Sequence, residues 1–253
     1  MSYKRCLLLI LVPAALAFSG CGKSALDESK AENNSNLPAS FGNGSISGKV
    51  VLKGTLPPPA KLSVSADPYC SNVNAGSVKD ETVVVAANGA MANVFVYVKE
   101  GAGSYPPPDK PVLLEQKSCV YAPHVTGVQI NQPLRIRNND PTLHNLHMIS
   151  KANGTMNIGL LGGADPFEIK FAKPEVMVEF KCDCHDWMYS YVGVLPHPFF
   201  CVTGNDGTYQ IKRLPPGNYK LVAWQEKYGE SIPQNVEIKN NEAVTQDFTF
   251  TAR

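Results

Sequence analysis

A short run near residue 185 places three soft metal-binding side chains within seven residues. Cys182, His185 and Met188 follow one another with two residues between each pair. They offer a thiolate, an imidazole and a thioether, and a mononuclear copper site combines one Cys and two His with a weak axial Met. His144, 38 residues before Cys182, can supply the second imidazole. The fold must then bring these two segments together, as a Greek-key barrel does.

Past residue 44 the chain alternates short β-rich segments with turn clusters and has no helical period of any length. This pattern predicts an all-β protein with two sandwiches or barrels. Strands are expected over 46–52, 82–86 and 93–98. The Pro-rich stretch 105–109 predicts a domain boundary.

Composition limits the partners. The length of 253 residues allows one large domain or two small ones, and 43% hydrophobic content with 18% charge is ample for a packed core. The net charge is +1, and no run of Lys or Arg forms a basic patch of the kind that phosphate binding needs. We therefore expect no nucleic-acid partner.

The first residues resemble an export signal. Lys4 and Arg5 precede an apolar run over 6–17 that is too short to span a bilayer and suits the core of a signal peptide. Residues 16–21 resemble a bacterial lipoprotein processing site, which implies that Cys21 carries lipid and that residues 1–21 are the signal segment. A plain secretory peptide with a coincidental Cys is the alternative.

The residues after Cys21 resemble a lipoprotein's tether. Gly22, where an Asp would favour inner-membrane retention, resembles outer-membrane sorting. Residues 22–44 are polar and poor in large apolar side chains, which predicts a flexible linker. The expected location is the bacterial cell envelope, lipid-anchored, at the outer membrane and facing the periplasm or the surface.

Seven cysteines leave five once Cys6 is removed and Cys21 carries lipid. These are Cys70, Cys119, Cys182, Cys184 and Cys201. An exported protein can form disulfides, and an odd remainder is expected if Cys182 is a metal ligand. Cys70 with Cys119 is the preferred bridge, because both lie beside strand-like segments away from the metal-binding run. Cys184 with Cys201 is a second, weaker pairing.

The C-terminal part resembles a carboxypeptidase regulatory-like (transthyretin-like) β-sandwich. Its signature, Asp-Gly-x-aromatic followed by Leu-Pro-x-Gly-x-Tyr, matches residues 206–209 and 214–219. That family begins with Ile-x-Gly-x-Val, found here at 46–50. The resemblance implies a discontinuous sandwich of residues 45–105 and 200–253 with residues 110–198 inserted. The alternative is a small N-terminal module, a central barrel and an independent C-terminal sandwich.

Residues 112–198 resemble the cupredoxins of the plastocyanin and amicyanin type. Segment 121–140 matches their early strands, His144 falls at the first His ligand, and Cys-x-x-His-x-x-Met has the spacing of the amicyanin ligand loop. The resemblance implies a Greek-key barrel over 110–198 that holds one type 1 copper ion. Its ligands would be His144, Cys182, His185 and Met188, with electrons passing through an exposed His edge. Asn145 would hold the ligand loop and hydrogen-bond near the thiolate.

Two of these ligands have alternative readings. Cys182 could instead be a disulfide partner of Cys184 or Cys201. Met188 could be a core residue, and Met148 or Met156 could take the axial role.

Other side chains near the site are assigned no ligand role. His147 lies three residues from His144, and in a strand an odd separation turns it to the opposite face. His124 and His197, each beside a proline, are interpreted as loop residues. Trp187 would pack over the site or line its surface, and partner docking is the remaining option.

Spacing excludes three other metal centres. Covalent haem needs Cys-x-x-Cys-His, and here one residue fewer separates Cys182 from Cys184. A binuclear copper centre needs two cysteines separated by three residues, and only Asp183 lies between Cys182 and Cys184. A trinuclear cluster needs His-x-His pairs, which the sequence lacks. Cys184 itself departs from cupredoxin loops and leaves the type of centre open.

The combined prediction is an envelope-anchored copper protein that carries single electrons between unidentified redox protein partners and is held to the membrane through its lipid. It is not expected to be an enzyme, because four protein ligands leave no open position for a substrate. Two alternatives remain. One is a copper-binding or copper-delivering protein without electron transfer, and the other is a structural or glycan-binding surface lipoprotein.

Overall fold

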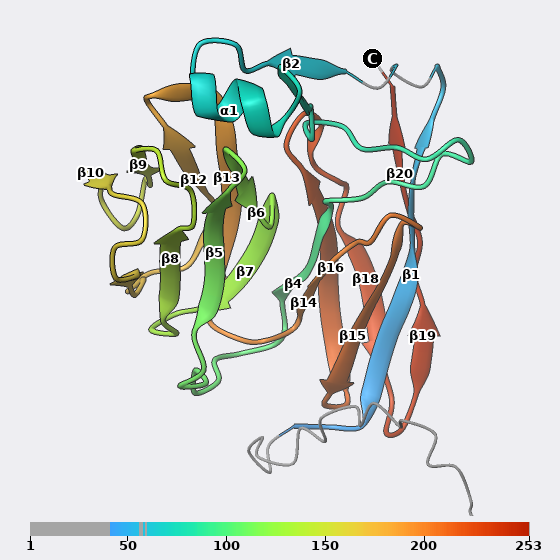
Figure 1. Ribbon diagram of the computed structural model, residues 1–253. Coiled ribbons are helices and arrows are strands. Elements are labelled where there is room, and N and C mark those ends of the chain that lie inside the picture. The colour runs from blue at the N-terminus through green and yellow to red at the C-terminus, as the bar shows by residue number, and fades with distance from the viewer. Residues whose placement is uncertain (1–40, 56–57, 59, 253) are drawn as a thin grey trace, which may run out of the picture. The chain divides into compact units, whose positions relative to one another are not determined.

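The computed structural model describes residues 41–55, 58 and 60–252. The predicted signal segment 1–21 with Cys21, and nearly all of the tether 22–44, lie outside the described residues. Within the described residues the chain is almost entirely β-structure, which confirms the predicted fold class (Figure 1). No helix of the described part is long and apolar enough to span a membrane.

The elements follow one another along the chain as twenty strands and one short helix in the described residues. They are β1(Gly44–Lys53), β2(Lys61–Ser63), α1(Pro68–Val73), β3(Ser77–Lys79), β4(Phe95–Glu100), β5(Val112–Lys117), β6(Val120–Ala122), β7(Val125–Gln129), β8(Leu134–Asn138), β9(His144–Ile149), β10(Met156–Leu160), β11(Phe167–Ile169), β12(Glu175–Cys182), β13(His185–Leu195), β14(Phe200–Val202), β15(Thr208–Leu214), β16(Gly217–Gln225), β17(Gly229–Glu230), β18(Gln234–Ile238), β19(Ala243–Thr245) and β20(Phe248–Thr251).

Two sheets built from β5 to β13 enclose one hydrophobic core. Their strand orders are β10-β9-β12-β13-β7 and β11-β8-β5-β6. Alternating residues of β8 and β9 point into this core, and Leu134, Ile136 and Leu146 are fully buried. The two-residue period therefore lines one face of each strand with apolar side chains, as the sequence pattern predicts.

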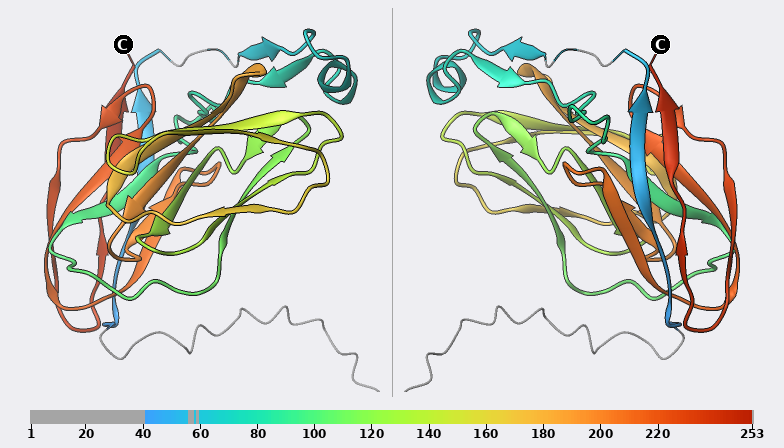
Figure 2. Two further views of the ribbon diagram at one scale, coloured as in Figure 1. Left: turned by 90° about the vertical axis from the view of Figure 1, so that its left-hand side faces the viewer. Right: turned by 90° about the vertical axis from the view of Figure 1, so that its right-hand side faces the viewer.

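Two further sheets contain the first and last strands of the described chain. β1 pairs with β15, β19 and β20, while β14, β4, β16, β17 and β18 form the second sheet. Figures 1 and 2 show β1, in blue, beside the red C-terminal strand β20. Strands from residues 44–53 and 208–251 thus share a sheet, although β5 to β13 intervene in the sequence. The domain boundaries stay a prediction.

Three details differ from the sequence-based expectations. Segment 82–86 is not a strand, because only Val85 pairs there, with Met91 in an isolated bridge. The sequence has no helical period of any length, yet α1 forms six helical residues behind the N-cap Asp67, with a Pro at its start. Residues 61–79, assigned by the prediction to the first part of the sandwich, instead add Val64 and Val78 to the core of β5 to β13.

Candidate metal centre

Three predicted ligands lie at the ends of three neighbouring strands, all at the same end of a single sheet. His144 is the first residue of β9, Cys182 the last of β12, and His185 the first of β13. β12 pairs with both β9 and β13, and Cys182 lies directly opposite His185 across the hairpin. The pairing of β9 with β12 therefore brings His144 close to Cys182, although the two residues are 38 positions apart in the sequence.

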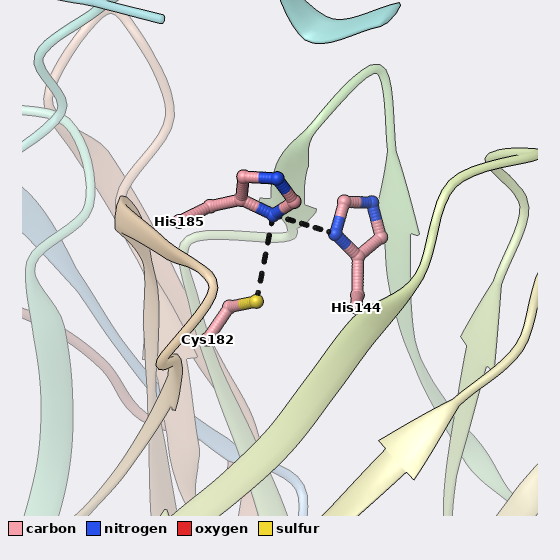
Figure 3. A group of neighbouring side chains, drawn as sticks. All are labelled: His144, Cys182 and His185. Carbon is pink, nitrogen blue, oxygen red and sulfur yellow. Dashed lines mark hydrogen bonds between the residues drawn. The ribbon is translucent and has the colours of Figure 1, made fainter. Parts of the chain in front are cut away.

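The donor atoms of these residues converge (Figure 3). The Nδ1 atoms of His144 and His185 are 3.0 Å apart, and Cys182 Sγ lies 3.6 Å from His185 Nδ1. One nitrogen from each imidazole and the sulfur all lie within 4.8 Å of one another. All three side chains are almost completely buried, with exposures of 0%, 1% and 4% for His144, Cys182 and His185. Such a group of soft and borderline donors is suited to a metal ion.

The outer nitrogens of both imidazoles face carboxylates. His144 Nε2 lies 2.9 Å from Asp140 Oδ2, and His185 Nε2 lies 3.4 Å from Asp67 Oδ2. A carboxylate accepts, so each Nε2 carries the proton and each Nδ1 presents a lone pair. In that tautomer the two Nδ1 lone pairs would face each other at 3.0 Å and repel, and a cation bound by both would remove that repulsion.

The 3.6 Å between Cys182 Sγ and His185 Nδ1 fits a metal bound by all three atoms, whereas the two Nδ1 atoms, at 3.0 Å, would have to move apart by about 0.5 Å. Bonds of about 2.0 Å to nitrogen and about 2.3 Å to sulfur in a trigonal plane set the donors roughly 3.5 to 3.7 Å apart. Burial lowers the pKa of His185 below its ordinary value, with the neighbouring His144 adding to the effect. Burial raises the pKa of the Cys182 thiol, although backbone N–H groups donate toward the sulfur. The imidazole is thus neutral and ready to bind, and the thiol would lose its proton to the metal.

Met188 and Asn145 are the other two residues predicted for the site. Met188 is 1% exposed and belongs to the same core cluster as Cys182. The Asn145 N–H donates to Cys182 Sγ at 3.4 Å, and the Asn145 side chain accepts from the Asp183 N–H and donates to the Asp183 carboxylate. Asn145 therefore connects β9 to the turn that carries the thiol.

The remaining histidines lie away from this group of donors. His147 is on the solvent-facing side of β9, and its Nδ1 is 2.9 Å from the Asp183 carboxylate. His124 pairs with Glu226. His197 packs on Phe199, and burial lowers the pKa of His197 to about 4. Trp187 packs on the His185 ring at 5.0 Å between ring centroids.

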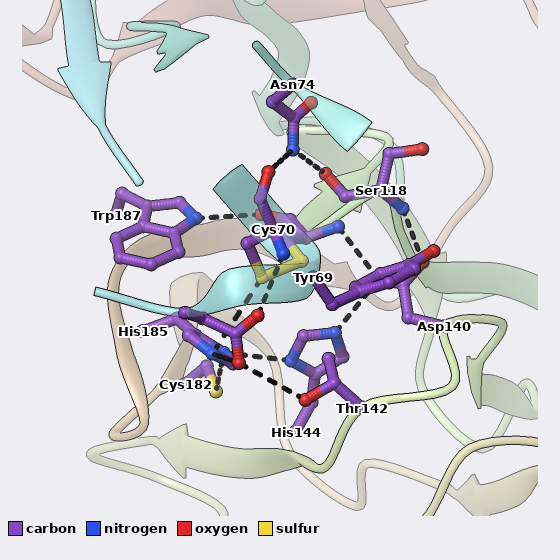
Figure 4. The surroundings of a disulfide bond; sticks show 12 residues. Tyr69, Cys70, Asn74, Ser118, Asp140, Thr142, His144, Cys182, His185 and Trp187 are labelled. Carbon is purple, nitrogen blue, oxygen red and sulfur yellow. Dashed lines mark hydrogen bonds and ion pairs between the residues drawn. A yellow bond between two sulfur atoms is a disulfide. The ribbon is translucent and has the colours of Figure 1, made fainter. Parts of the chain in front are cut away.

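The cysteines divide into one bridge and three free thiols among the described residues. Cys70 and Cys119 form a disulfide, the preferred pair of the sequence analysis (Figure 4). Cys182 is free, so the disulfide alternative for it does not occur. Cys184 and Cys201 are also free, and the suggested bridge between them is wrong. Cys184 lies in the exposed hairpin turn, whereas Cys201 is half-buried in β14 of another sheet.

The expected exposed imidazole edge is absent from this site. His185 is only 4% exposed, and its Nε2 faces Asp67 and also lies 3.9 Å from Cys70 Sγ. Helix α1 and its flanks therefore cover the edge that the sequence prediction left open to solvent.

Two functional carboxylates were missed from the sequence. Asp140 ends the segment 121–140 that resembles cupredoxin strands, and that resemblance assigns it no role. Asp67 lies 77 residues before His144, and its only sequence signal is Asp-Pro at a helix start. That signal predicts a cap and says nothing of a histidine partner.

Comparison with solved structures finds cupredoxins over about two fifths of the chain. A purple cupredoxin from Nitrosopumilus maritimus has 20% identity and a TM-score of 0.28, covering 32% of this chain and 97% of that one. An amicyanin variant in the Cu(I) state has 12% identity and a TM-score of 0.30, covering 39% and 97%.

A copper-containing nitrite reductase from Thermus scotoductus has 20% identity and a TM-score of 0.32. That match covers 40% of this chain, which corresponds to only 25% of the reductase. No protein-family model matches the chain, and no curated protein matches it.

Proposed function

We propose that the chain binds one copper ion through His144 Nδ1, Cys182 Sγ and His185 Nδ1, with Met188 as a weak axial ligand, and that it carries single electrons. The convergence of the two Nδ1 atoms, 3.0 Å apart, next to a buried thiol supports this proposal. Bound copper would supply a one-electron couple. The protein holds the donors in a fixed, nearly water-free arrangement, which limits rearrangement between oxidation states.

The proposal extends to the setting of the protein. We infer a lipid anchor at Cys21, a place in the bacterial cell envelope and redox proteins as partners. The sheets of β1, β4 and β14 to β20 would be a carboxypeptidase regulatory-like sandwich. A carrier rather than an enzyme is proposed, because four protein ligands leave the metal no position for a substrate.

Copper binding is tested by adding Cu(II) to the mature, metal-free protein and recording the visible spectrum. We expect an intense thiolate-to-copper band that is absent from Cys182→Ser. The matched control is Cys184→Ser, which removes an exposed thiol two residues away and should keep the band. A colourless wild-type protein, or a band lost only in the control, would contradict the site.

Electron transfer is tested on the same samples by cyclic voltammetry. A reversible one-electron couple, lost with Cys182, is expected for an electron carrier. Copper that binds but is released on each reduction would instead favour the alternative of a copper-delivering protein.

A further inference from the structure

A short segment from outside the three ligand-bearing strands covers the candidate metal centre. Residues 61–79, here called the cover, comprise β2, α1 and β3 and add Val64, Cys70 and Val78 to the core beneath them. The cover places two atoms against the outer edge of His185. Asp67 Oδ2 is 3.4 Å and Cys70 Sγ 3.9 Å from His185 Nε2.

Asp67 has two oxygens with two different tasks. Oδ1 accepts from the Cys70 N–H at 2.8 Å and so caps helix α1. Oδ2 accepts from Thr142 Oγ1 at 3.3 Å and faces His185 Nε2. Capping needs only one oxygen, and Ser would serve as well as Asp. The second carboxylate oxygen is therefore available for the imidazole.

The cover is fastened to the rest of the fold just after Asp67. The disulfide joins Cys70 to Cys119, and Asn74 Nδ2 donates to the carbonyls of Cys70 and Ser118 at 3.0 and 2.9 Å (Figure 4). The Tyr69 hydroxyl donates to Asp140 at 3.2 Å. These contacts fix the position of α1, so the Asp67 carboxylate is held against His185 rather than meeting it by chance.

The two candidate ligand imidazoles have the same kind of neighbour at Nε2, a carboxylate. His144 faces Asp140, which also accepts from the Cys119 N–H at 2.8 Å, and His185 faces Asp67, which accepts from the Cys70 N–H. Each histidine is thus linked through a carboxylate to one half of the same disulfide. A carboxylate on the outer nitrogen fixes the tautomer and ring orientation of a metal-bound histidine and makes it a stronger ligand.

We propose that Asp67 is a positioning residue for the metal centre: presented by the disulfide-fastened cover, it holds His185 with Nδ1 toward the metal and strengthens metal binding. This inference rests on the proposed copper site. The cover then has a role beyond packing, since it closes the imidazole edge and supplies the carboxylate that orients the ligand.

The substitution Asp67→Ser separates this role from capping. Serine can still accept the Cys70 N–H, but its shorter, uncharged side chain cannot reach His185. We expect Cu(I) affinity, measured by competition with bicinchoninate, to fall by about 10- to 100-fold. Asp206→Ser is the matched control, because Asp206 also accepts a backbone N–H, that of Thr208, in a turn of another sheet. Its copper affinity should equal that of the wild type.

A second readout does not depend on copper. In the metal-free protein, imidazole ¹⁵N chemical shifts should report the Nε2–H tautomer of His185, and Asp67→Ser should give a mixture of both tautomers. An unchanged thermal midpoint of the metal-free variant would show that the cap is kept.

The outcomes are distinguishable. Unchanged affinity and an unchanged tautomer in Asp67→Ser, with the Cys182-dependent band intact, would overturn the role of Asp67 alone. A wild-type protein with no such band would overturn the copper site and, with it, this inference.

Discussion

Glu175, the first residue of β12, accepts hydrogen bonds from the turn that follows β9. Its carboxylate accepts from Ser150 Oγ, from the Lys151 N–H at 2.7 Å and from the Ala152 N–H at 3.1 Å. Burial alone would push the pKa of Glu175 upward, but these hydrogen bonds outweigh it and leave the pKa below its ordinary value. The folded state therefore binds this proton less readily than the unfolded chain does.

The stability that the Glu175 carboxylate contributes depends on pH. The stabilisation is fully present above the unfolded-state pKa of about 4.3 and is lost as pH falls through the lower pKa of the folded state. Glu175→Gln should lower the free energy of unfolding by about 1 kcal/mol at neutral pH, since the site is partly exposed. The difference from wild type should shrink as the solution is acidified. Urea titrations from neutral pH down to pH 3 measure it, with exposed Glu237→Gln as control. A difference that grew toward low pH would contradict the assignment.

Individual residues also show how far the sequence could predict the site. Cys182, His185 and Met188 lie in one hairpin, at the end of β12 and in the first part of β13, so their spacing alone indicates a ligand loop. His144 could be added only through the resemblance to the cupredoxins, and the structure places β9 beside β12. Asp67 could not be added, since its contact with His185 depends on how the cover packs. No local pattern encodes that packing.

At the scale of elements, the disulfide joins helix α1 to the turn between β5 and β6. Cys70 and Cys119 are 49 residues apart in sequence, and both are fully buried. Linking them restricts the unfolded chain. In the chain-entropy model, a disulfide that closes a loop of this length stabilises the folded state by about 4 kcal/mol. The bridge is therefore expected to be one of the largest single contributions to stability.

The double variant Cys70→Ala/Cys119→Ala tests this contribution. We expect a loss of about 3 to 4 kcal/mol in the free energy of unfolding, measured in urea without reductant. Cys201→Ala removes a half-buried free cysteine from β14 and should cost about 1 kcal/mol or less. Equal losses in the two variants would show that the bridge adds nothing beyond the packing of its side chains.

Elements were predicted well where side-chain alternation and backbone pairing agree. β1, expected over 46–52, has Ile46, Val50 and Leu52 buried, and it pairs along its length with β15 and β20. Segment 82–86 has the β-branched composition of a strand, but its Thr82 N–H is taken by Asp80. Composition favours a pleated surface, while a strand also needs a partner for its backbone groups, and the sequence does not show that partner.

At the scale of the whole molecule, a third hydrophobic cluster joins strands of the ligand-bearing sheet to β4 and β14. Phe95 of β4 lies at its centre and is fully buried, 5.3 Å from the Phe200 ring. Gly127 of β7 and Gly193 of β13 are paired directly opposite each other. A Cβ on Gly193 would lie 2.5 Å from Phe95 Cζ, and one on Gly127 would lie 2.4 Å from Phe200 Cε2. Glycine is needed at both positions because the aromatic rings rest directly on the backbone.

Gly193→Ala should therefore destabilise the protein by overpacking, by about 1 to 3 kcal/mol in urea unfolding. The ring of Phe95 cannot yield easily, since it is enclosed by Tyr97 and Phe200. Gly159→Ala is the matched control in β10 of the same sheet, where the added methyl would meet only Leu143 Cδ1 at 3.6 Å. That change should be neutral or slightly stabilising, because glycine weakens a strand.

The visible band of bound copper shows whether Gly193→Ala changes only the contact with Phe95 or also the metal centre. His185 begins β13 and Gly193 lies near its other end, so Gly193→Ala should keep the wild-type spectrum while losing stability. Equal stability of Gly193→Ala and Gly159→Ala would contradict the close packing of Phe95 on the strand. A shifted band at full stability would instead mean that strain at this end of β13 reaches the ligands, and the metal centre would then respond to the contact between the sheets.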